Sequence, residues 1–183
     1  MKDKILIKEF LKDKNVGVVV SSSKNIVNKI IAEIDFERAN IIVEYGPGNG
    51  TITKQLLKKM NSDASLFVFE TNQDFIEHLN NINDTRLVII NADAKSALLI
   101  LKNRYKIEDV DYIISTIPFT FLDQRLKRRI IFSSFTMLKE KRKFLTYQYT
   151  PLIYSIIKNK FKNHSIKPNL INLPPAFIMK GVK

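Results

Sequence analysis

The chain has 183 residues, 45% of them hydrophobic, which predicts one globular domain over residues 1–183. It contains no cysteine, which excludes disulfides and a thiolate nucleophile, and its two distant histidines give no basis for a metal site. No apolar run reaches the roughly 18 residues of a membrane-spanning helix, and the N-terminus lacks the pattern of a secretory signal. We therefore expect a cytoplasmic protein.

The net charge of +12 is concentrated near the C-terminus. Residues 121–183 contain 14 Lys and Arg but only two Asp and Glu, whereas residues 41–120 contain eight basic and ten acidic residues. A basic segment of this kind indicates a negatively charged partner, either an anionic membrane or a nucleic acid.

Residues 1–38 are predicted to form helices that precede a catalytic core of residues 39–183. Residues 2–14 place apolar side chains on one stripe among lysines, a pattern typical of a basic amphipathic helix. Ser21–Ser23 provide hydroxyl groups that cap a second helix running to about Ile34.

From residue 41 onward, apolar strand-like runs alternate with helical segments. The strands are predicted at 41–45, 65–70, 86–91 and 110–115, and the helices at 51–60, 73–81, 95–104 and 123–138. Strands that are apolar on both faces and separated by helices are typical of a parallel sheet covered by helices on both sides. We therefore predict an α/β fold with a Rossmann-like sheet.

The C-terminal part departs from this alternation. A fifth strand is predicted at 143–149, followed by a helix from Pro151 to about Phe161. Two extended segments then follow, at 166–172 and 175–182, with too few residues between them for a crossover helix. Such a pair must be antiparallel, so the sheet is predicted to be mostly parallel with an antiparallel C-terminal strand.

Three of the five glycines lie close together, between the first predicted strand and the first helix. Gly46, Gly48 and Gly50 allow positive φ and a close approach of ligand to backbone, and the helix that follows offers free N–H groups. Dinucleotide-binding folds use G-x-G-x-x-G, whereas this loop reads G-x-G-x-G behind Glu44. A carboxylate in that position disfavours a pyrophosphate and suits a cationic ligand.

Two more acidic residues follow the next strands. Glu70 ends the second strand and Asp93 follows the third, so that both lie with Glu44 at the edge where open α/β sheets bind ligands. A carboxylate at Glu70 can accept hydrogen bonds from both ribose hydroxyls, and Asp93 faces the expected position of an adenine.

These residues together resemble the first three motifs of class I S-adenosylmethionine-dependent methyltransferases. The resemblance covers residues 40–183, and it implies that S-adenosylmethionine is the cofactor. By this resemblance, Glu44 and the glycine loop bind the amino-acid part of the cofactor, Glu70 the ribose and Asp93 the adenine. The implied cofactor contacts are Glu44, Gly46, Gly48, Gly50, Glu70, Thr71, Asp93, Ala94 and Ser115.

The substrate depends on the segment after the fourth strand, which reads STIPF at 115–119. Many amine methyltransferases have Asn or Asp, then proline and an aromatic residue, at this point. The chain resembles rRNA adenine dimethyltransferases in Pro118 and Phe119, but Ser115 replaces their asparagine, and the sequence ends where their helical RNA-binding domain would begin. An rRNA or tRNA adenine N-methyltransferase is therefore the second hypothesis.

Bacterial phospholipid N-methyltransferases give the better match. The chain resembles them in Val16-Gly17 with Ser21-Ser22, in residues 115–118, in Phe144 to Tyr149 and in residues 172–176. It lacks their proline before Ser22, and residues 116–117 replace their usual Gly-Leu. The resemblance implies methylation of the amine of a phosphatidylethanolamine-type lipid, with Tyr149, Ser115 and Pro118 as the candidate catalytic residues.

Three basic clusters, at 125–129, 139–143 and 158–162, are predicted to help the N-terminal helix bind the inner face of the cell membrane. The same clusters would also attract RNA phosphates, so charge does not separate the two enzyme hypotheses. A third hypothesis is a basic RNA-binding or lipid-binding module without enzymatic activity, which the intact glycine loop disfavours.

Overall fold

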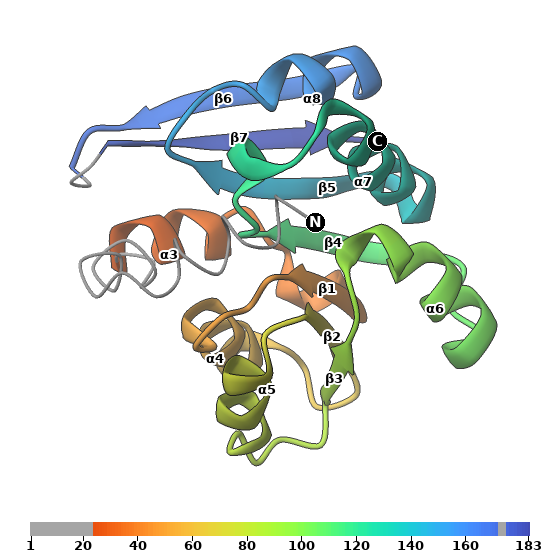
Figure 1. Ribbon diagram of the computed structural model, residues 1–183. Coiled ribbons are helices and arrows are strands. Elements are labelled where there is room, and N and C mark those ends of the chain that lie inside the picture. Colours follow the sequence, from red (N-terminus) through yellow and green to blue (C-terminus); the bar gives the residue numbers. More distant parts are fainter. Residues whose placement is uncertain (1–23, 172–174) are drawn as a thin grey trace.

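The computed structural model describes residues 24–171 and 175–183, arranged as a twisted sheet with helices on both faces (Figure 1). The helix predicted at 2–14 and its lysines lie outside the described residues. The elements, in chain order, are α3 (Lys24–Ile31), η2 (Phe36–Arg38), β1 (Ile41–Tyr45), α4 (Thr51–Lys59), β2 (Ser65–Glu70), α5 (Gln73–Asn80), β3 (Leu87–Asn91), η3 (Ala94–Ser96), α6 (Ala97–Tyr105), β4 (Val110–Ser115), η4 (Phe119–Phe121), α7 (Gln124–Met137), β5 (Leu138–Gln148), α8 (Tyr154–Lys160), β6 (Asn163–Asn169) and β7 (Ala176–Val182).

The sheet has seven strands in the order β3-β2-β1-β4-β5-β7-β6. The first five in this order are parallel to one another, whereas β7 runs antiparallel to both of its neighbours, β5 and β6. This arrangement confirms the predicted α/β fold and its reversed C-terminal strand. The chain order reverses at β1, because β2 pairs on one side of it and β4 on the other, which creates the crevice where such sheets bind ligands.

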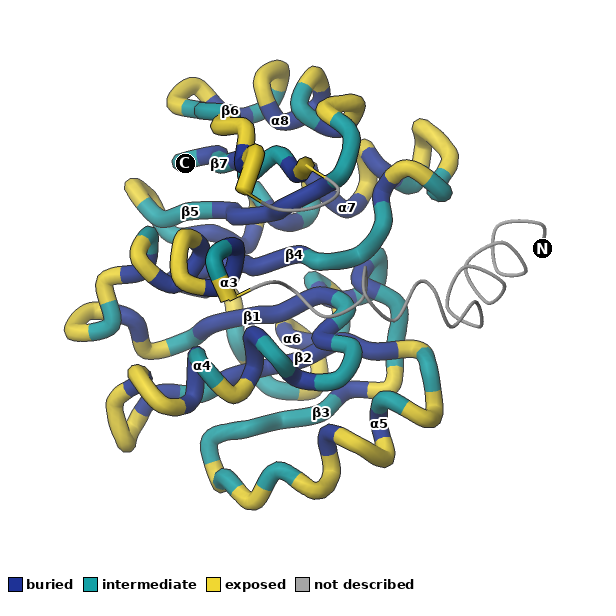
Figure 2. Tube along the Cα trace, turned by 90° about the vertical axis from the view of Figure 1, so that its left-hand side faces the viewer, coloured by how far each residue is buried: buried dark blue, intermediate teal, exposed yellow. Residues whose placement is uncertain are grey.

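Two hydrophobic cores sandwich the sheet. One core joins α3 and α4 to a face of the sheet that includes Ile42, Leu66 and Ile114. The other joins α6, α7 and α8 to the opposite face, which includes Val43 and Phe144. In Figure 2, β1, β4 and β5 are dark blue along most of their length, whereas the edge strand β3 is mainly of intermediate burial. The central strands are buried on both faces because they were apolar on both faces in the sequence.

Strand β5 is longer than predicted. It begins at Leu138 rather than at residue 143, and its pairing with β4 shifts register between Val110 and Tyr112. Lys141 lies in this irregular part with a φ of 64°. Four of the five added residues, 139–142, are charged, and an apolar pattern therefore did not reveal them. They are held by Asp111, which is buried and accepts a hydrogen bond from Lys139 at 3.0 Å.

Other boundaries differ by a few residues. The helix predicted from Pro151 begins at Tyr154, because residue 151 starts a turn whose carbonyl accepts the Tyr154 N–H at 2.9 Å. The helix predicted at 95–104 opens with the 3-10 turn η3 before α6 begins at Ala97. Strand β6 occupies Asn163–Asn169 rather than 166–172. Within the described residues, none of the helices has the length and apolar character that crossing a membrane requires.

Candidate active site

The glycine loop between β1 and α4 has an unusual backbone that explains its sequence. Gly46, Gly48 and Gly50 have φ values of 68°, 56° and 77°, a region that L side chains rarely adopt. A Cβ on Gly46 would lie 2.7 Å from Cγ2 of Ile117, whereas a Cβ on Gly48 would have no neighbour within 4 Å. The loop is therefore packed against the β4 connection at its first glycine and open at its second.

Glu44 lies beneath this loop, at the end of β1, and is buried. Its Oε2 accepts a hydrogen bond from the Thr53 hydroxyl at 2.7 Å, but its Oε1 has no hydrogen-bond partner among the described residues. Burial raises the pKa of Glu44 from 4.5 to about 7, and the charge of nearby Glu70 also raises it. The unpartnered oxygen marks a place where a donor, preferably a cationic one, is missing.

Glu70, at the end of β2, is held in place by backbone groups. Its Oε1 accepts the N–H groups of Thr71 and Asn72 at 2.7 and 2.9 Å, and its Oε2 accepts the Gly48 N–H at 3.2 Å. Glu70, predicted as an acidic site residue at the end of the second strand, thus contacts the glycine loop that was predicted after the first strand. The structure brings these two sequence motifs together.

Asp93 and Ala94 lie at the next connection, between β3 and α6. Asp93 caps η3 by accepting the Lys95 N–H at 2.9 Å, and its other oxygen is 3.6 Å from Nζ of Lys95. Ala94 is buried against the core. Their backbone positions at the carboxyl edge agree with the sequence prediction, while an adenine contact stays a prediction.

The segment after β4 is held by hydrogen bonds from Gln148, a residue that the sequence did not single out. The buried Gln148, the last residue of β5, donates from Nε2 to the Ile117 carbonyl at 3.0 Å and accepts the Phe119 N–H at 3.1 Å. These two bonds hold the backbone on either side of Pro118. A polar residue at the end of the mostly apolar second half of this strand, residues 144–148, was the available signal.

The two remaining catalytic candidates lie at the same edge. Ser115 ends β4, is fully buried, and has an Oγ without a hydrogen-bond partner among the described residues. Tyr149 follows β5 directly and packs on the α3 side of the sheet, edge-on to Tyr147 with ring centroids 6.2 Å apart. Whether Ser115, Pro118 and Tyr149 act in catalysis stays a prediction.

The three basic clusters occupy different places. The cluster at 125–129 begins α7 and lies near the carboxyl edge, because η4 and β4 lead directly into it. The cluster at 139–143 begins β5 at the opposite edge, where Arg142 pairs with Asp111 at 3.4 Å and Lys143 with Glu33 at 2.9 Å. The cluster at 158–162 is also far from the site, since Asn163 pairs with Val182. Only the first cluster adjoins the candidate site.

Comparisons with known proteins agree with this geometry. The family model for ribosomal RNA adenine dimethylase matches residues 10–150. An ornithine lipid N-methyltransferase from Singulisphaera acidiphila is 27% identical over 175 residues, which cover 92% of this chain and 90% of that protein. Ribosomal RNA small subunit methyltransferase A from Mycoplasma capricolum is 31% identical over 78% of this chain, which spans 51% of that relative.

Solved structures share the fold at low sequence identity. The N-methyltransferase NodS from Bradyrhizobium japonicum, in complex with S-adenosylhomocysteine, superposes with a TM-score of 0.73 at 10% identity and covers 99% of this chain and 98% of its own. A precorrin-6y C5,15-methyltransferase from Geobacter metallireducens has a TM-score of 0.69 at 12% identity, covering 90% and 94%. From the family match and the fold, the chain belongs to the ribosomal RNA adenine dimethylase family and is a class I S-adenosylmethionine-dependent methyltransferase.

Proposed function

We propose that this methyltransferase transfers methyl groups to the amine headgroup of an aminolipid, of the phosphatidylethanolamine type, at an anionic membrane surface on the cytoplasmic side. The similarity to an ornithine lipid N-methyltransferase over nearly the whole chain supports an aminolipid as the substrate class. The observation that carries the proposal is the surface around the candidate site.

Three strongly exposed aliphatic side chains lie at the carboxyl edge of the sheet. Leu152 is 61% exposed, Leu170 is 75% exposed and Ile171 is 78% exposed. Leu152 follows the end of β5, and the other two follow the end of β6, where Asn169 pairs with Ala176 beside the end of β5. In Figure 1 these strand ends lie at the left-hand edge, toward which the arrowheads of β4 and β5 also point. We call these three residues the aliphatic rim.

The aliphatic rim suits a lipid surface better than an RNA. Each aliphatic side chain that passes from water into the acyl region contributes about 1.5–3 kcal/mol when fully buried. Exposed Arg125 and Arg128, at the start of α7, would each add about 1 kcal/mol near anionic headgroups. An enzyme that methylates headgroups needs this orientation, with its site facing the membrane.

The residues of the glycine loop fit S-adenosylmethionine. The unpartnered Oε1 of Glu44 is placed to accept from a cationic amino group, and the open space at Gly48 lets a ligand approach the backbone. When bound, S-adenosylmethionine supplies an electrophilic methyl group. Glu70 already accepts three backbone N–H groups, so its carboxylate is oriented before any ribose hydroxyl binds.

The segment after β4 is our proposed amine site. Gln148 fixes the backbone around Pro118. The buried Ser115 hydroxyl has no hydrogen-bond partner among the described residues, so it would lose none of those when it bonds to a substrate N–H. Tyr149 is the proposed contact for the amine or the lipid phosphate. The contribution of these groups is mainly positioning in a dry site, because methyl transfer is a direct displacement by the amine nitrogen after it has lost its proton.

A second candidate function is adenine N-methylation in RNA. The family match and the Mycoplasma relative favour it, and the basic start of α7 would serve phosphate contacts equally well.

The deciding experiment incubates the protein and methyl-labelled S-adenosylmethionine with three substrates in parallel: phosphatidylethanolamine vesicles, ornithine lipid vesicles and rRNA. We expect label in an aminolipid and none in RNA. Glu44→Gln serves as the control, because label from this site must fall in every arm. Label found in RNA alone would overturn the lipid proposal and establish the second candidate.

A further inference from the structure

Thr116, directly after β4, links the glycine loop to the proposed amine site. Its N–H continues the ladder between β4 and β1 and bonds to the Tyr45 carbonyl at 2.9 Å. Its hydroxyl donates to the carbonyl of the next residue, Gly46, and its oxygen lies 3.4 Å from the Tyr45 carbonyl oxygen. Since both partners are carbonyls, the hydroxyl can only be the donor. The first glycine of the loop is therefore held by a side chain of the segment that follows β4.

Gly46 is held from both strands that flank β1. On the β2 side, its N–H donates to the Phe69 carbonyl at 2.9 Å. On the β4 side, its carbonyl accepts from the Thr116 hydroxyl, and the Ile117 side chain packs where a Cβ would lie. The bond on the β2 side joins two backbone groups, which almost any residue provides. The bond on the β4 side depends on the hydroxyl of one side chain.

Gly46 needs such a bond because glycine restricts its own backbone less than other residues do. Its φ is 68°, and glycine adopts negative φ about as readily. Hydrogen bonds to both the N–H and the carbonyl limit rotation on either side of its Cα. The direction in which the rest of the loop leaves β1 is therefore fixed in part by Thr116.

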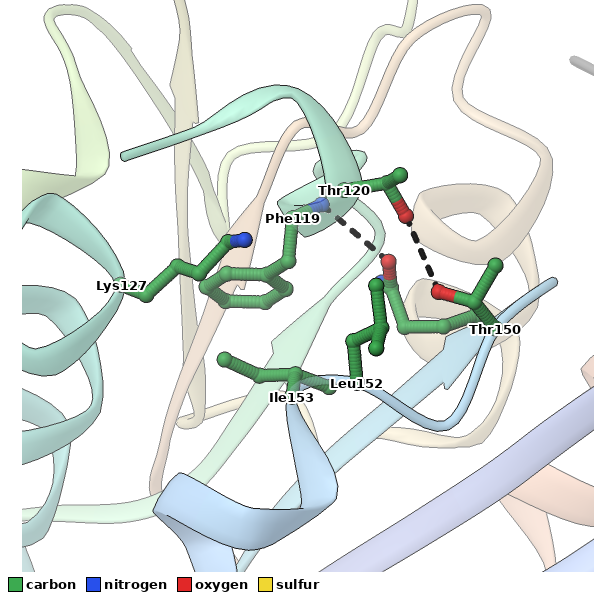
Figure 3. Close-up of a pocket in the computed structure, with 7 residues that line it drawn as sticks. Phe119, Thr120, Lys127, Thr150, Leu152 and Ile153 are labelled. Atoms are coloured by element: carbon green, nitrogen blue, oxygen red, sulfur yellow. Dashed lines mark hydrogen bonds between the residues drawn. The ribbon is translucent and has the colours of Figure 1, made fainter. Parts of the chain in front are cut away.

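The segment that begins at Thr116 is stiff and is fastened to β5. Pro118 has a restricted φ, here −76°, and Gln148 bonds to the backbone on either side of it. Farther along, the hydroxyls of Thr120 and Thr150 bond to each other at 3.1 Å, as Figure 3 shows. These bonds hold the outer part of the segment. Its place relative to the glycine loop is set at its other end, by Thr116.

We propose that Thr116 is a positioning residue for methyl transfer, whose hydroxyl holds the loop for the methyl donor in a fixed place against the segment for the amine. The inference rests on the proposed amine site and adds the residue that aligns this site with the cofactor loop. A displacement depends steeply on the distance and angle between its reactants, and a misplacement of about 1 Å costs about 100-fold in rate. Thr116 acts through Gly46, so its loss should lower the rate and leave the affinities intact.

The first test compares Thr116→Val, which removes the hydroxyl and keeps the shape, with Thr116→Ser, which keeps the hydroxyl. Thr136→Val is the matched control, because the exposed Thr136 hydroxyl also donates to a backbone carbonyl, that of Phe132, at 3.0 Å within α7. Rates are measured with phosphatidylethanolamine and with ornithine lipid in detergent micelles. Calorimetry measures the affinity for S-adenosylhomocysteine.

We expect Thr116→Val to lower kcat by about tenfold or more, while KM for the lipid and the affinity for S-adenosylhomocysteine change by about twofold at most. Thr116→Ser should remain within about threefold of the wild-type kcat, since its hydroxyl reaches the same carbonyl. Thr136→Val should leave all three quantities unchanged.

A second readout needs no methyl acceptor. Amide hydrogen exchange is followed by mass spectrometry in peptides that cover residues 119–122, with and without S-adenosylhomocysteine. Because Thr116 joins the loop to this segment, binding at the loop should slow exchange at 119–122 by about threefold or more in wild type and in Thr116→Ser. In Thr116→Val the same addition should have little effect there.

Four results would overturn the inference. They are an unchanged kcat in Thr116→Val, an equal fall of kcat in Thr136→Val, a fall in Thr116→Ser as large as that in Thr116→Val, and equal slowing of exchange in Thr116→Val and wild type.

The two readouts separate this inference from the proposed function. Slowing of exchange that requires Thr116, in a protein that labels no lipid, would retain the positioning role and reject the aminolipid function. Lipid labelling with the same kcat in Thr116→Val and wild type would retain the function and reject the positioning role. If rRNA alone is labelled, the aminolipid function is rejected, and kcat is compared on rRNA with the same expected loss in Thr116→Val.

Discussion

The carboxyl edge of the sheet has two dissimilar halves. The half over β1, β2 and β3 is built from backbone groups and carboxylates: the glycine loop, Glu44, Glu70 and Asp93. The half over β4, β5, β7 and β6 is built from a buried amide, a buried lysine and the aliphatic rim. The first half suits a cationic, hydroxyl-rich ligand, and the second an anionic, apolar one.

The two proposed ligands would therefore bind to halves of the edge that differ in charge as well as in position. Residues 41–120 have slightly more acidic than basic side chains, while residues 121–183 have a large basic excess. A substrate anion is thereby drawn to the β5 half and repelled from the carboxylates of the β1 half. Except for Gly46→Ala, each variant below alters one half and leaves the other as the internal reference.

The largest effect is expected at the first glycine of the loop. Gly46→Ala combines a positive φ with a Cβ 2.7 Å from Ile117, so it should lower the free energy of unfolding by about 2–5 kcal/mol. Because Ile117 belongs to the β4 connection, this variant damages both halves. Gly48→Ala meets no neighbour and should lose only about 1 kcal/mol while weakening cofactor binding. Chemical denaturation measures the free energy of unfolding, and calorimetry measures cofactor binding. Equal stability of the two variants would contradict the close packing of Gly46 against Ile117.

Glu44→Gln should weaken binding of S-adenosylmethionine by about 10- to 100-fold and leave lipid binding unchanged. The wild-type affinity should fall as pH drops below 7, since the pKa of Glu44 is about 7 without ligand and a protonated carboxyl is a poor partner for an ammonium group. The affinity of Glu44→Gln for S-adenosylmethionine should not depend on pH in this way. Calorimetry between pH 5.5 and 8.5 provides the measurement.

The same residue predicts how stability depends on pH. Because its folded pKa is raised above 4.5, the folded protein without ligand retains a proton that the unfolded chain releases. The contribution of Glu44 to stability is therefore greatest below about pH 4.5 and is lost as pH rises to about 7. Denaturation of wild type should show this loss relative to Glu44→Gln, and parallel curves would contradict it.

Gln148→Met should act on the other half. It leaves the Ile117 carbonyl and the Phe119 N–H without partners, so we expect kcat to fall by about tenfold while cofactor affinity stays within about twofold. Gln124→Met, at an exposed position of α7, is the control. A loss confined to cofactor affinity would show that the two halves are not separable.

The smallest effect is expected at the aliphatic rim. Ile171→Asp should reduce binding to phosphatidylethanolamine vesicles by about fivefold in a flotation assay, while activity on detergent-dispersed lipid stays unchanged. Leu99→Asp makes the same kind of change at a residue that is 55% exposed and lines the β3 edge, at the far end of the sheet. Equal losses of vesicle binding in both variants would show that the aliphatic rim is not part of the membrane-facing surface.

Sequence reasoning succeeded where one local pattern determines the outcome. The parallel strands followed from runs that are apolar on both faces, and the glycine loop from three glycines where the backbone now has positive φ. It failed at the start of β5, where Lys139 and Arg142 are paired with Asp111, and at Gln148. The partners, Asp111 for the two basic residues and residues 117 and 119 for Gln148, lie distant in the chain. A charged or amide side chain does not by itself indicate which residue it will pair with.

The sequence by itself therefore determined the alternation of strands and helices and the place of the glycine loop, because those depend on hydrophobic periodicity and on backbone conformations that only glycine adopts freely. The cofactor class followed from the resemblance that these motifs carry. The tertiary structure alone decided which buried polar atoms lack a hydrogen-bond partner among the described residues, such as the Oε1 of Glu44, the hydroxyl of Ser115 and the Nδ2 of Asn169. Burial and hydrogen bonding depend on every segment that packs around a group, and these segments come together only when the sheet is formed.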